Sequence, residues 1–167
     1  MLTDLILQQA KFRINEESIP RILKCLSMLT IDEVWKKPNE NTNSIGNLIL
    51  HLEGNATQWI LSTFTDHADY RNRDYEFEST EKLSKEILID RLNHLKNKLE
   101  RCFENLKESQ LSSIYTVQCF DESGVSIIIH VIEHFSYHTG QITLLTKLLT
   151  NKATNFYEDL DLNQTNN

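Results

Sequence analysis

The sequence contains few residues that break helices, with only 4 glycines and 2 prolines among its 167 residues. A turn-rich β-sandwich or β-barrel needs such residues at regular intervals, so their scarcity excludes those folds and favours long helices. A chain of this length is expected to form one domain with a substantial hydrophobic core. Its composition, 40% hydrophobic and 25% charged, is typical of a soluble globular protein.

Long apolar runs and positive charge are also lacking. No run approaches the roughly 20 apolar residues of a membrane-spanning helix, and the N-terminus MLTDLILQQAKF lacks the basic leader of a signal peptide. The formal net charge is −7, and the lysines and arginines are scattered along the chain. We therefore expect no binding to nucleic acid or to an anionic membrane.

The chain has three cysteines, Cys25, Cys102 and Cys119, without CxxC spacing. An odd number of unclustered cysteines does not fit the disulfide framework of a small secreted protein. We therefore expect free or buried thiols and a cytoplasmic location.

Hydrophobic periodicity predicts an all-α fold with four helical segments, because apolar residues recur at steps of three and four. The expected segments run from about Leu2 to Leu29, from Asn43 or Ser44 to Phe64, from Ser79 or Thr80 to Leu106, and from Ser123 to Leu149. We expect these segments to form a single domain over residues 1–150, followed by a polar C-terminal tail over residues 151–167.

Two interruptions of this pattern are expected. Pro20 lies inside the first segment and should kink or interrupt it. The stretch SSIYTVQCFDESG alternates apolar and polar residues around Tyr115 and Val117, which indicates a short extended piece before the fourth segment.

Three histidines in the fourth segment, His130, His134 and His138, are spaced four residues apart. Successive residues at this spacing are displaced by only about 40° around a helix, so the three share one face. Two such imidazoles can hold one metal ion, because their Cβ atoms lie about 5–6 Å apart. Two protein ligands rarely suffice, and His51, in a different predicted helix, is the best candidate for the third.

Of the three clustered histidines, we expect His134 and His138 to bind metal, since they lie nearer the middle of the histidine face. His130 is one turn earlier and is expected to support the site or to be structural. The alternative for any single one is a core imidazole bonded to the backbone or to tyrosine. His67, in a predicted loop, and His94, on the polar side of the third segment, are expected to be solvated.

The second segment carries a polar face made of Asn47, His51, Asn55 and Gln58, each within about 40° of His51. Four polar residues in line on a helix that must also pack indicate the wall of a polar cleft. The alternative is an ordinary solvent face, because the opposite side of this segment is apolar. Glu53 and Glu133 are candidates for orienting the imidazoles. The alternative, which fits equally well, is that both are ordinary surface glutamates.

Two stretches, NSIGNLILHLEGNATQWI at residues 43–60 and HVIEHFSYHTGQI at residues 130–142, resemble the DinB-like superfamily of bacterial four-helix-bundle proteins. ESIPRILKCLSML followed by VWKKPN is similar to the first helix and loop of that superfamily. RNRDYEF is similar to the next connection in an uncharacterised branch. The resemblance spans the chain to about Leu149, and the pairing of HxxxHxGQI with HLxGN is more specific than either motif alone.

The resemblance implies a four-helix bundle with one divalent metal ion held by His51, His134 and His138. Zinc is the first expectation, with nickel, iron and manganese as alternatives, since imidazole suits several metals. Characterised relatives include transferases that use low-molecular-weight thiols such as bacillithiol or mycothiol. The residue after the last histidine is often arginine in relatives and is Thr139 here. If that arginine holds an anionic thiol, its absence argues against a thiol transferase.

Two function classes follow. The first is an enzyme that uses the metal to transfer a small thiol to a small-molecule electrophile, or a related hydrolase. The second is a non-catalytic metal- or ligand-binding bundle with a stress-response role. An open coordination position favours the enzyme, and a fourth protein ligand favours the binding protein. No further catalytic residue stands out in the sequence.

The first segment carries more apolar residues than one stripe can bury, including Leu5, Ile6, Leu7, Phe12 and Ile14. Consecutive residues diverge by about 100° around a helix, so some of them should remain as an exposed patch. Relatives often form homodimers, and we expect this patch to serve a homodimer. The alternative is that the connection DYRNRDYEF covers the patch within one subunit.

Overall fold

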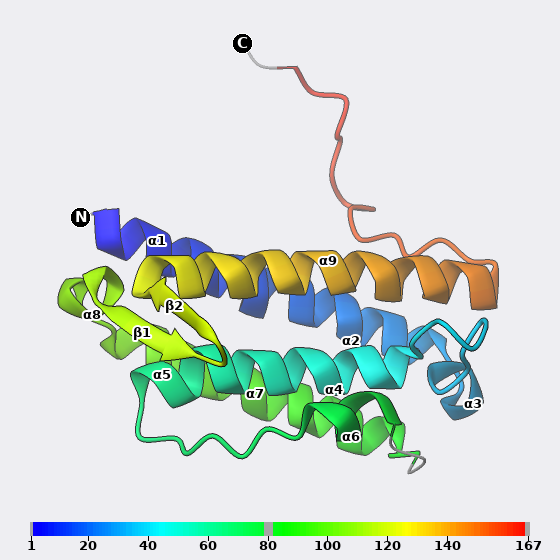
Figure 1. The fold of residues 1–167 in the computed structure, drawn as a ribbon. Coiled ribbons are helices and arrows are strands. Elements are labelled where there is room, and N and C mark those ends of the chain that lie inside the picture. Colours follow the sequence, from blue (N-terminus) through cyan, green and yellow to red (C-terminus); the bar gives the residue numbers. More distant parts are fainter. Residues whose placement is uncertain (1, 79–81, 166–167) are drawn as a thin grey trace.

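Four long helical stretches and one small two-stranded sheet make up the fold (Figure 1). The computed structural model describes residues 2–78 and 82–165. In chain order the elements are α1 (Leu2–Lys11), the π-helix η1 (Phe12–Ser18), α2 (Ile19–Met28), α3 (Ile31–Val34), α4 (Ile45–Ala56), the π-helix η2 (Thr57–Leu61), α5 (Ser62–Phe64), α6 (Arg73–Glu78), α7 (Lys85–Asn105), α8 (Glu108–Ser112), β1 (Ile114–Val117), β2 (Phe120–Ser123) and α9 (Gly124–Thr150). The prediction of a mostly helical protein is confirmed.

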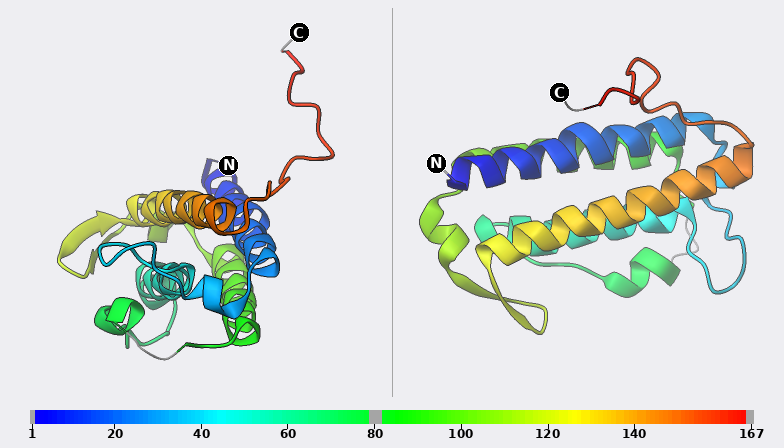
Figure 2. Two further views of the ribbon diagram at one scale, coloured as in Figure 1. Left: turned by 90° about the vertical axis from the view of Figure 1, so that its right-hand side faces the viewer. Right: turned by 90° about the horizontal axis from the view of Figure 1, so that it is seen from above.

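The four long stretches, α1–η1–α2, α4–η2–α5, α7 and α9, lie side by side around a shared core (Figure 2). Fully buried side chains from each stretch fill this core, among them Ile14, Ile22, Ile49, Leu92, Leu99 and Phe135. Figure 1 shows that α4 and α7 run in the same direction, so the connection between them returns along the side of α4 and carries α6. None of the helices in the described ranges is long and apolar enough to cross a bilayer.

Serine side chains define where three of the long helices begin. The hydroxyl oxygens of Ser44, Ser84 and Ser123 each accept a hydrogen bond from the backbone N–H three residues later, which satisfies a free donor of the first turn. Two of these starts agree with the prediction. The third helix begins at Lys85 rather than near Ser79 or Thr80, which lie outside the described residues; residues 82–84 are not helical.

The interruption expected at Pro20 takes the form of a π-helix rather than a break. Residues 12–18 form η1, and Pro20 follows as the second residue of α2. In an α-helix the proline ring clashes with the carbonyl four residues earlier. The wider i→i+5 turn of η1 changes the register just before this point and lets the helical path continue to Met28.

The extended piece expected before the last helix is a β-hairpin. Strands β1 and β2 pair antiparallel from Ile114↔Ser123 to Val117↔Phe120. Gln118, in the two-residue turn, has a left-handed backbone with φ 57°. The hairpin brings the ring of Phe120 to 6.2 Å from that of Trp59 on η2.

The first helical stretch leaves apolar side chains in solvent, as expected. Leu2, Leu5 and Phe12 are exposed, whereas Leu7 and Ile14 are buried. The alternative that the connection DYRNRDYEF covers this patch is wrong. Its helix α6 packs on α4 instead, where the Asn47 side-chain amide donates a hydrogen bond of 2.9 Å to the carbonyl oxygen of Glu76.

Candidate metal centre

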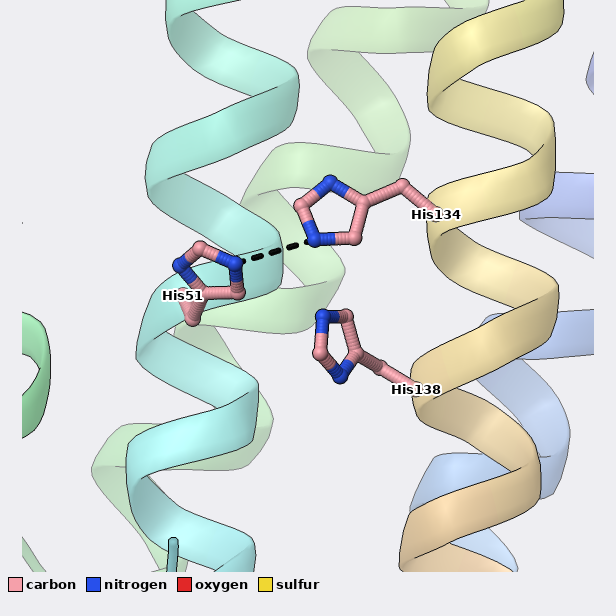
Figure 3. Close-up of side chains that lie close together, drawn as sticks. All are labelled: His51, His134 and His138. Atoms are coloured by element: carbon pink, nitrogen blue, oxygen red, sulfur yellow. Dashed lines mark hydrogen bonds between the residues drawn. The ribbon is translucent and has the colours of Figure 1, made fainter.

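Three histidines from two neighbouring helices converge on one point (Figure 3). His51 projects from α4, and His134 and His138 project from successive turns of α9. The Nε2 atoms of His51 and His134 are 2.9 Å apart. One nitrogen from each of the three rings lies within 4.8 Å of the others. These histidines are therefore positioned to hold a metal ion.

The ring of His51 is oriented by Glu76. Its Nδ1 lies 2.8 Å from Oε2 of Glu76 and 3.2 Å from Nη2 of Arg71. Arginine can only donate and a carboxylate can only accept, so the shorter contact is an Nδ1–H donated to Glu76. This tautomer leaves the lone pair on Nε2, which faces His134.

Glu76 is a buried carboxylate with a full set of partners. Arg71 donates to both of its oxygens, at 2.7 and 2.9 Å. Burial alone would raise the pKa of Glu76, but the hydrogen bonds from His51 and Arg71 outweigh it and lower the pKa. A Cβ atom on Gly54 would lie 2.1 Å from Oε1 of Glu76. The glycine in the HLEGN motif is therefore required for the carboxylate of Glu76 to lie this close to α4.

His134 and His138 are held in the neutral form that binds metals. Burial, with the neighbouring histidines acting in the same direction, lowers the pKa of His134 to about 3. Burial also lowers the pKa of His138, against the opposing hydrogen bond from its Nδ1 to Oε1 of Gln141 at 2.7 Å. That hydrogen bond leaves Nε2 of His138 free. Nδ1 of His134 is buried and has no partner in residues 2–78 and 82–165.

The donor set fits a divalent ion such as zinc. Zn–N bonds of about 2.0–2.1 Å place two nitrogens of one site roughly 3.0–3.4 Å apart. The distances found here, 2.9 Å for one pair and at most 4.8 Å for the set, need only small ring movements. Within the described ranges the group consists of these three neutral donors, without a fourth protein ligand.

A cavity of about 320 Å³ opens beside the histidines. Its lining residues come from α4, η2, α6 and the connection before it, the hairpin and α9, and include His51, His134, Trp59, Phe120 and Arg73. Two larger clefts, of about 480 and 880 Å³, are lined by other residues and do not reach these histidines. The cavity is therefore the place where a small molecule can approach the candidate metal position.

His130 lies in the cavity wall and outside the converging group, and its supporting role stays a prediction. Its ring stacks on Trp59 with centroids 4.0 Å apart. Its Nε2 lies 3.5 Å from Nδ2 of Asn55, whose Oδ1 is buried without a partner among the described residues. Exchanging the amide O and N of Asn55 would give the imidazole N–H an acceptor.

The two remaining histidines lie away from the metal centre. His94 is exposed, and its Nδ1 lies 2.7 Å from the carbonyl oxygen of Asp90, which agrees with the expected solvated side chain. His67 is half-buried in the loop after α5.

The polar face of the second segment is a cleft wall, and the solvent-face alternative is wrong. Asn47, His51 and Asn55 are all buried, because Glu76 of α6 contacts Asn47 and His51 and because Asn55 lies beside His130 of α9. Gln58, at the end of this face, accepts a hydrogen bond of 2.9 Å from Arg71.

Among the described contacts neither Glu53 nor Glu133 bonds to an imidazole, so the alternative of ordinary surface glutamates applies to both. Glu53 pairs with Arg91 at 2.6 Å, and Glu133 is exposed in a cleft on another side of α9. The orienting pair is Glu76 with Arg71, and nothing in the local spacing of either indicates this role. The available signals were Gly54, which a packing helix would not otherwise need, and the RNRDYEF resemblance.

Thr139, the residue after the last histidine, is buried and lines the cleft between α9 and the first helical stretch. It follows His138 by one residue and so points about 100° away from it. The side chain at this position is therefore not part of the metal cavity wall.

Comparisons with known proteins give a fold and a family. Curated proteins include no match to the chain. A crystal structure described as that of the conserved protein of locus from Enterococcus faecalis is similar, with a TM-score of 0.64 and 18% sequence identity over 90% of this chain and 96% of that one. At this identity the likeness shows the fold alone. Residues 4–160 match the family described as "Protein of unknown function (DUF1572)", and the chain belongs to that family.

Proposed function

We propose that this protein is a four-helix bundle of the DinB-like superfamily that holds one divalent metal ion with His51, His134 and His138. The proposal is supported by the HLxGN and HxxxHxGQI motifs and by the convergence of the three rings. Zinc is the first candidate, and nickel, iron and manganese are the alternatives.

We propose further that the metal centre is catalytic, as a transferase for a small thiol or a related hydrolase. The observation that carries this is the cavity lined by two of the three histidines, His51 and His134, with no fourth protein ligand in the described residues. A bound divalent ion supplies a Lewis acid that lowers the pKa of a thiol or a water molecule. Glu76 holds His51 in the binding tautomer, and Trp59 and Phe120 keep one side of the cavity apolar.

The test is elemental analysis of protein purified without a nickel column, followed by a conjugation assay with cysteine and 1-chloro-2,4-dinitrobenzene. We expect about one metal ion per chain and a conjugation rate above that of the His134→Ala variant. A metal-loaded protein without any rate above that control would support the non-catalytic binding class instead. A protein that binds no divalent metal would overturn the metal centre.

We propose a small-molecule substrate, no nucleic-acid or membrane partner, and a homodimer formed through the patch of Leu2, Leu5 and Phe12. The exposure of these side chains supports the dimer, and the three free cysteines support a reducing, cytoplasmic environment. Sedimentation at micromolar concentration should show a dimer that Leu5→Glu converts to a monomer. A wild-type monomer of 19.5 kDa would contradict the dimer.

A further inference from the structure

The cavity beside the histidines contains two charges of opposite sign that no other described residue neutralises. Arg73 of α6 and Glu122 of β2 both line it, and neither forms an ion pair with another residue in the described ranges. The guanidinium of Arg73 instead lies 5.1 Å from the ring centroid of Phe77. The charge of Arg71, by contrast, is neutralised by Glu76. A ligand in this cavity therefore meets one available cation and one available anion.

A flat apolar wall lies in the same cavity. The ring of Trp59 stacks on His130 at 4.0 Å and lies 6.2 Å from Phe120, so the three rings form a continuous surface. Phe120 is 50% exposed, which leaves its ring available to a ligand. Nε1 of Trp59 is buried and has no acceptor among the described residues. The hydrogen bonding of this indole is therefore incomplete in the protein alone.

The size of the cavity limits what it can hold. Its volume of about 320 Å³ is near the lower end of the range of about 300–1,000 Å³ found for ligand pockets. The occupant is therefore a small metabolite rather than a peptide or a long acyl chain.

We propose that this cavity binds a small zwitterion with a flat apolar group, of which an aromatic α-amino acid is the simplest example. Its carboxylate pairs with Arg73, its ammonium group pairs with Glu122, and its ring packs on Trp59 and Phe120. The proposal rests on the proposed function only in treating the cavity as the substrate site of the metal centre. The binding groups belong to the chain itself, so binding is measurable without metal.

The experiment is isothermal titration calorimetry with three probes that share one aryl group: L-phenylalanine, 3-phenylpropionate and 2-phenylethylamine. L-Phenylalanine should bind about tenfold or more tightly than either analogue, because each analogue lacks one of the two charge-assisted hydrogen bonds. Equal or tighter binding of either analogue would overturn the zwitterion proposal, as would the absence of saturable binding by all three probes.

Two variants test which charged residue binds the carboxylate of the ligand and which binds its ammonium group. Arg73→Gln should reduce the affinity for L-phenylalanine to that for 2-phenylethylamine, and Glu122→Gln should reduce it to that for 3-phenylpropionate. The matched controls are Arg101→Gln and Glu133→Gln, which change exposed residues outside the cavity lining. Circular dichroism checks that each variant is folded. Unchanged affinity in either cavity variant would overturn the proposal.

Each titration is run on chelator-treated and on zinc-loaded protein, with zinc content measured separately. If zinc fails to bind but L-phenylalanine binds with the predicted pattern, the metal function fails and this proposal stands. If zinc binds at the histidines but the probes show no charge discrimination, this proposal fails and the metal function stands.

Discussion

Oε2 of Glu76 lies 2.8 Å from Nδ1 of His51, so a side chain of α6 fixes the orientation of a candidate metal ligand on α4. Both side chains are nearly buried, with 5% and 9% of their surfaces exposed. The tautomer of His51 therefore depends on a segment that begins more than twenty residues later in the chain. The metal affinity of the site should depend on that segment as well.

Glu76→Gln should weaken metal binding by about 10–100-fold, the usual cost of removing a group that orients a metal-binding histidine. It should also lower the free energy of unfolding by about 3–5 kcal/mol, because the charge of Arg71 is left buried and unpaired. Metal titration and urea unfolding measure the two effects.

Glu53→Gln is the control for Glu76→Gln, since Glu53 pairs with the exposed Arg91 rather than with a group of the metal centre. The double variant Glu76→Gln with Arg71→Met should recover stability without recovering metal affinity. Wild-type metal affinity in Glu76→Gln would show that Glu76 does not support the metal centre.

Gly54→Ala should act on the same contact without changing any charge. The added methyl group would lie 2.1 Å from Oε1 of Glu76 and must displace the carboxylate from His51. We expect about a tenfold loss of metal affinity and retention of the helical signal. Gly140→Ala is the matched control, because a Cβ atom there meets no atom within 4 Å. Equal metal affinity in the two variants would contradict this role of Gly54.

Single alanine substitutions of His51, His134 and His138 should each abolish stable metal binding, because two protein ligands rarely hold an ion. His130→Ala and His94→Ala should retain the metal, since neither side chain belongs to the converging group. Elemental analysis of the five purified variants checks the set. Full occupancy in His134→Ala would exclude the assignment.

Removing the metal should leave the protein folded but less stable. The core of buried aliphatic side chains does not depend on the metal ligands. A ligand present at a hundred times its dissociation constant stabilises the native state by about 2.7 kcal/mol. Chelation followed by circular dichroism should therefore show an unchanged helical signal and a lower melting temperature. Loss of helix on chelation would identify the metal as structural.

Of the three cysteines, Cys119 alone should react rapidly with a thiol reagent. It is exposed in the hairpin turn, whereas Cys25 and Cys102 are buried. Burial raises the pKa of the Cys25 thiol, and it raises that of Cys102 to about 11, so both stay protonated and unreactive at neutral pH. A timed reaction with 5,5′-dithiobis(2-nitrobenzoate) should show one fast thiol, which Cys119→Ser removes. Two fast thiols in the native protein would contradict the buried positions.

The helices and the histidine cluster were predictable because their signals are periodic. Steps of three and four residues identify the buried stripes, and steps of four place His130, His134 and His138 on one face. His51 could be joined to them because a metal needs a ligand from another helix and because of the family resemblance. The structure brings His51, His134 and His138 together as expected.

The outer parts of the site were not predictable in the same way. Glu76 and Arg71 reach His51 through a connection that returns along α4, and the path of a connection is set by tertiary packing rather than by local spacing. The hairpin was recognisable as extended, but its contact with Trp59 depends on the same long-range packing. From residue spacing alone, the polar face of α4 is therefore equally compatible with a solvent face, because α6 reaches it only through tertiary packing.

The π-helix η2 directly follows the stretch of α4 that carries His51 and Asn55. An i→i+5 turn holds one residue more than an α-turn, so η2 is equivalent to a single-residue insertion in the helix. Removing one residue there would rotate everything beyond it by about 100° relative to α4. The metal ligands would stay in place, whereas Trp59 would turn away from His130. Insertions and deletions at this point can therefore change the apolar wall of the cavity in evolution while the three metal-binding histidines keep their positions.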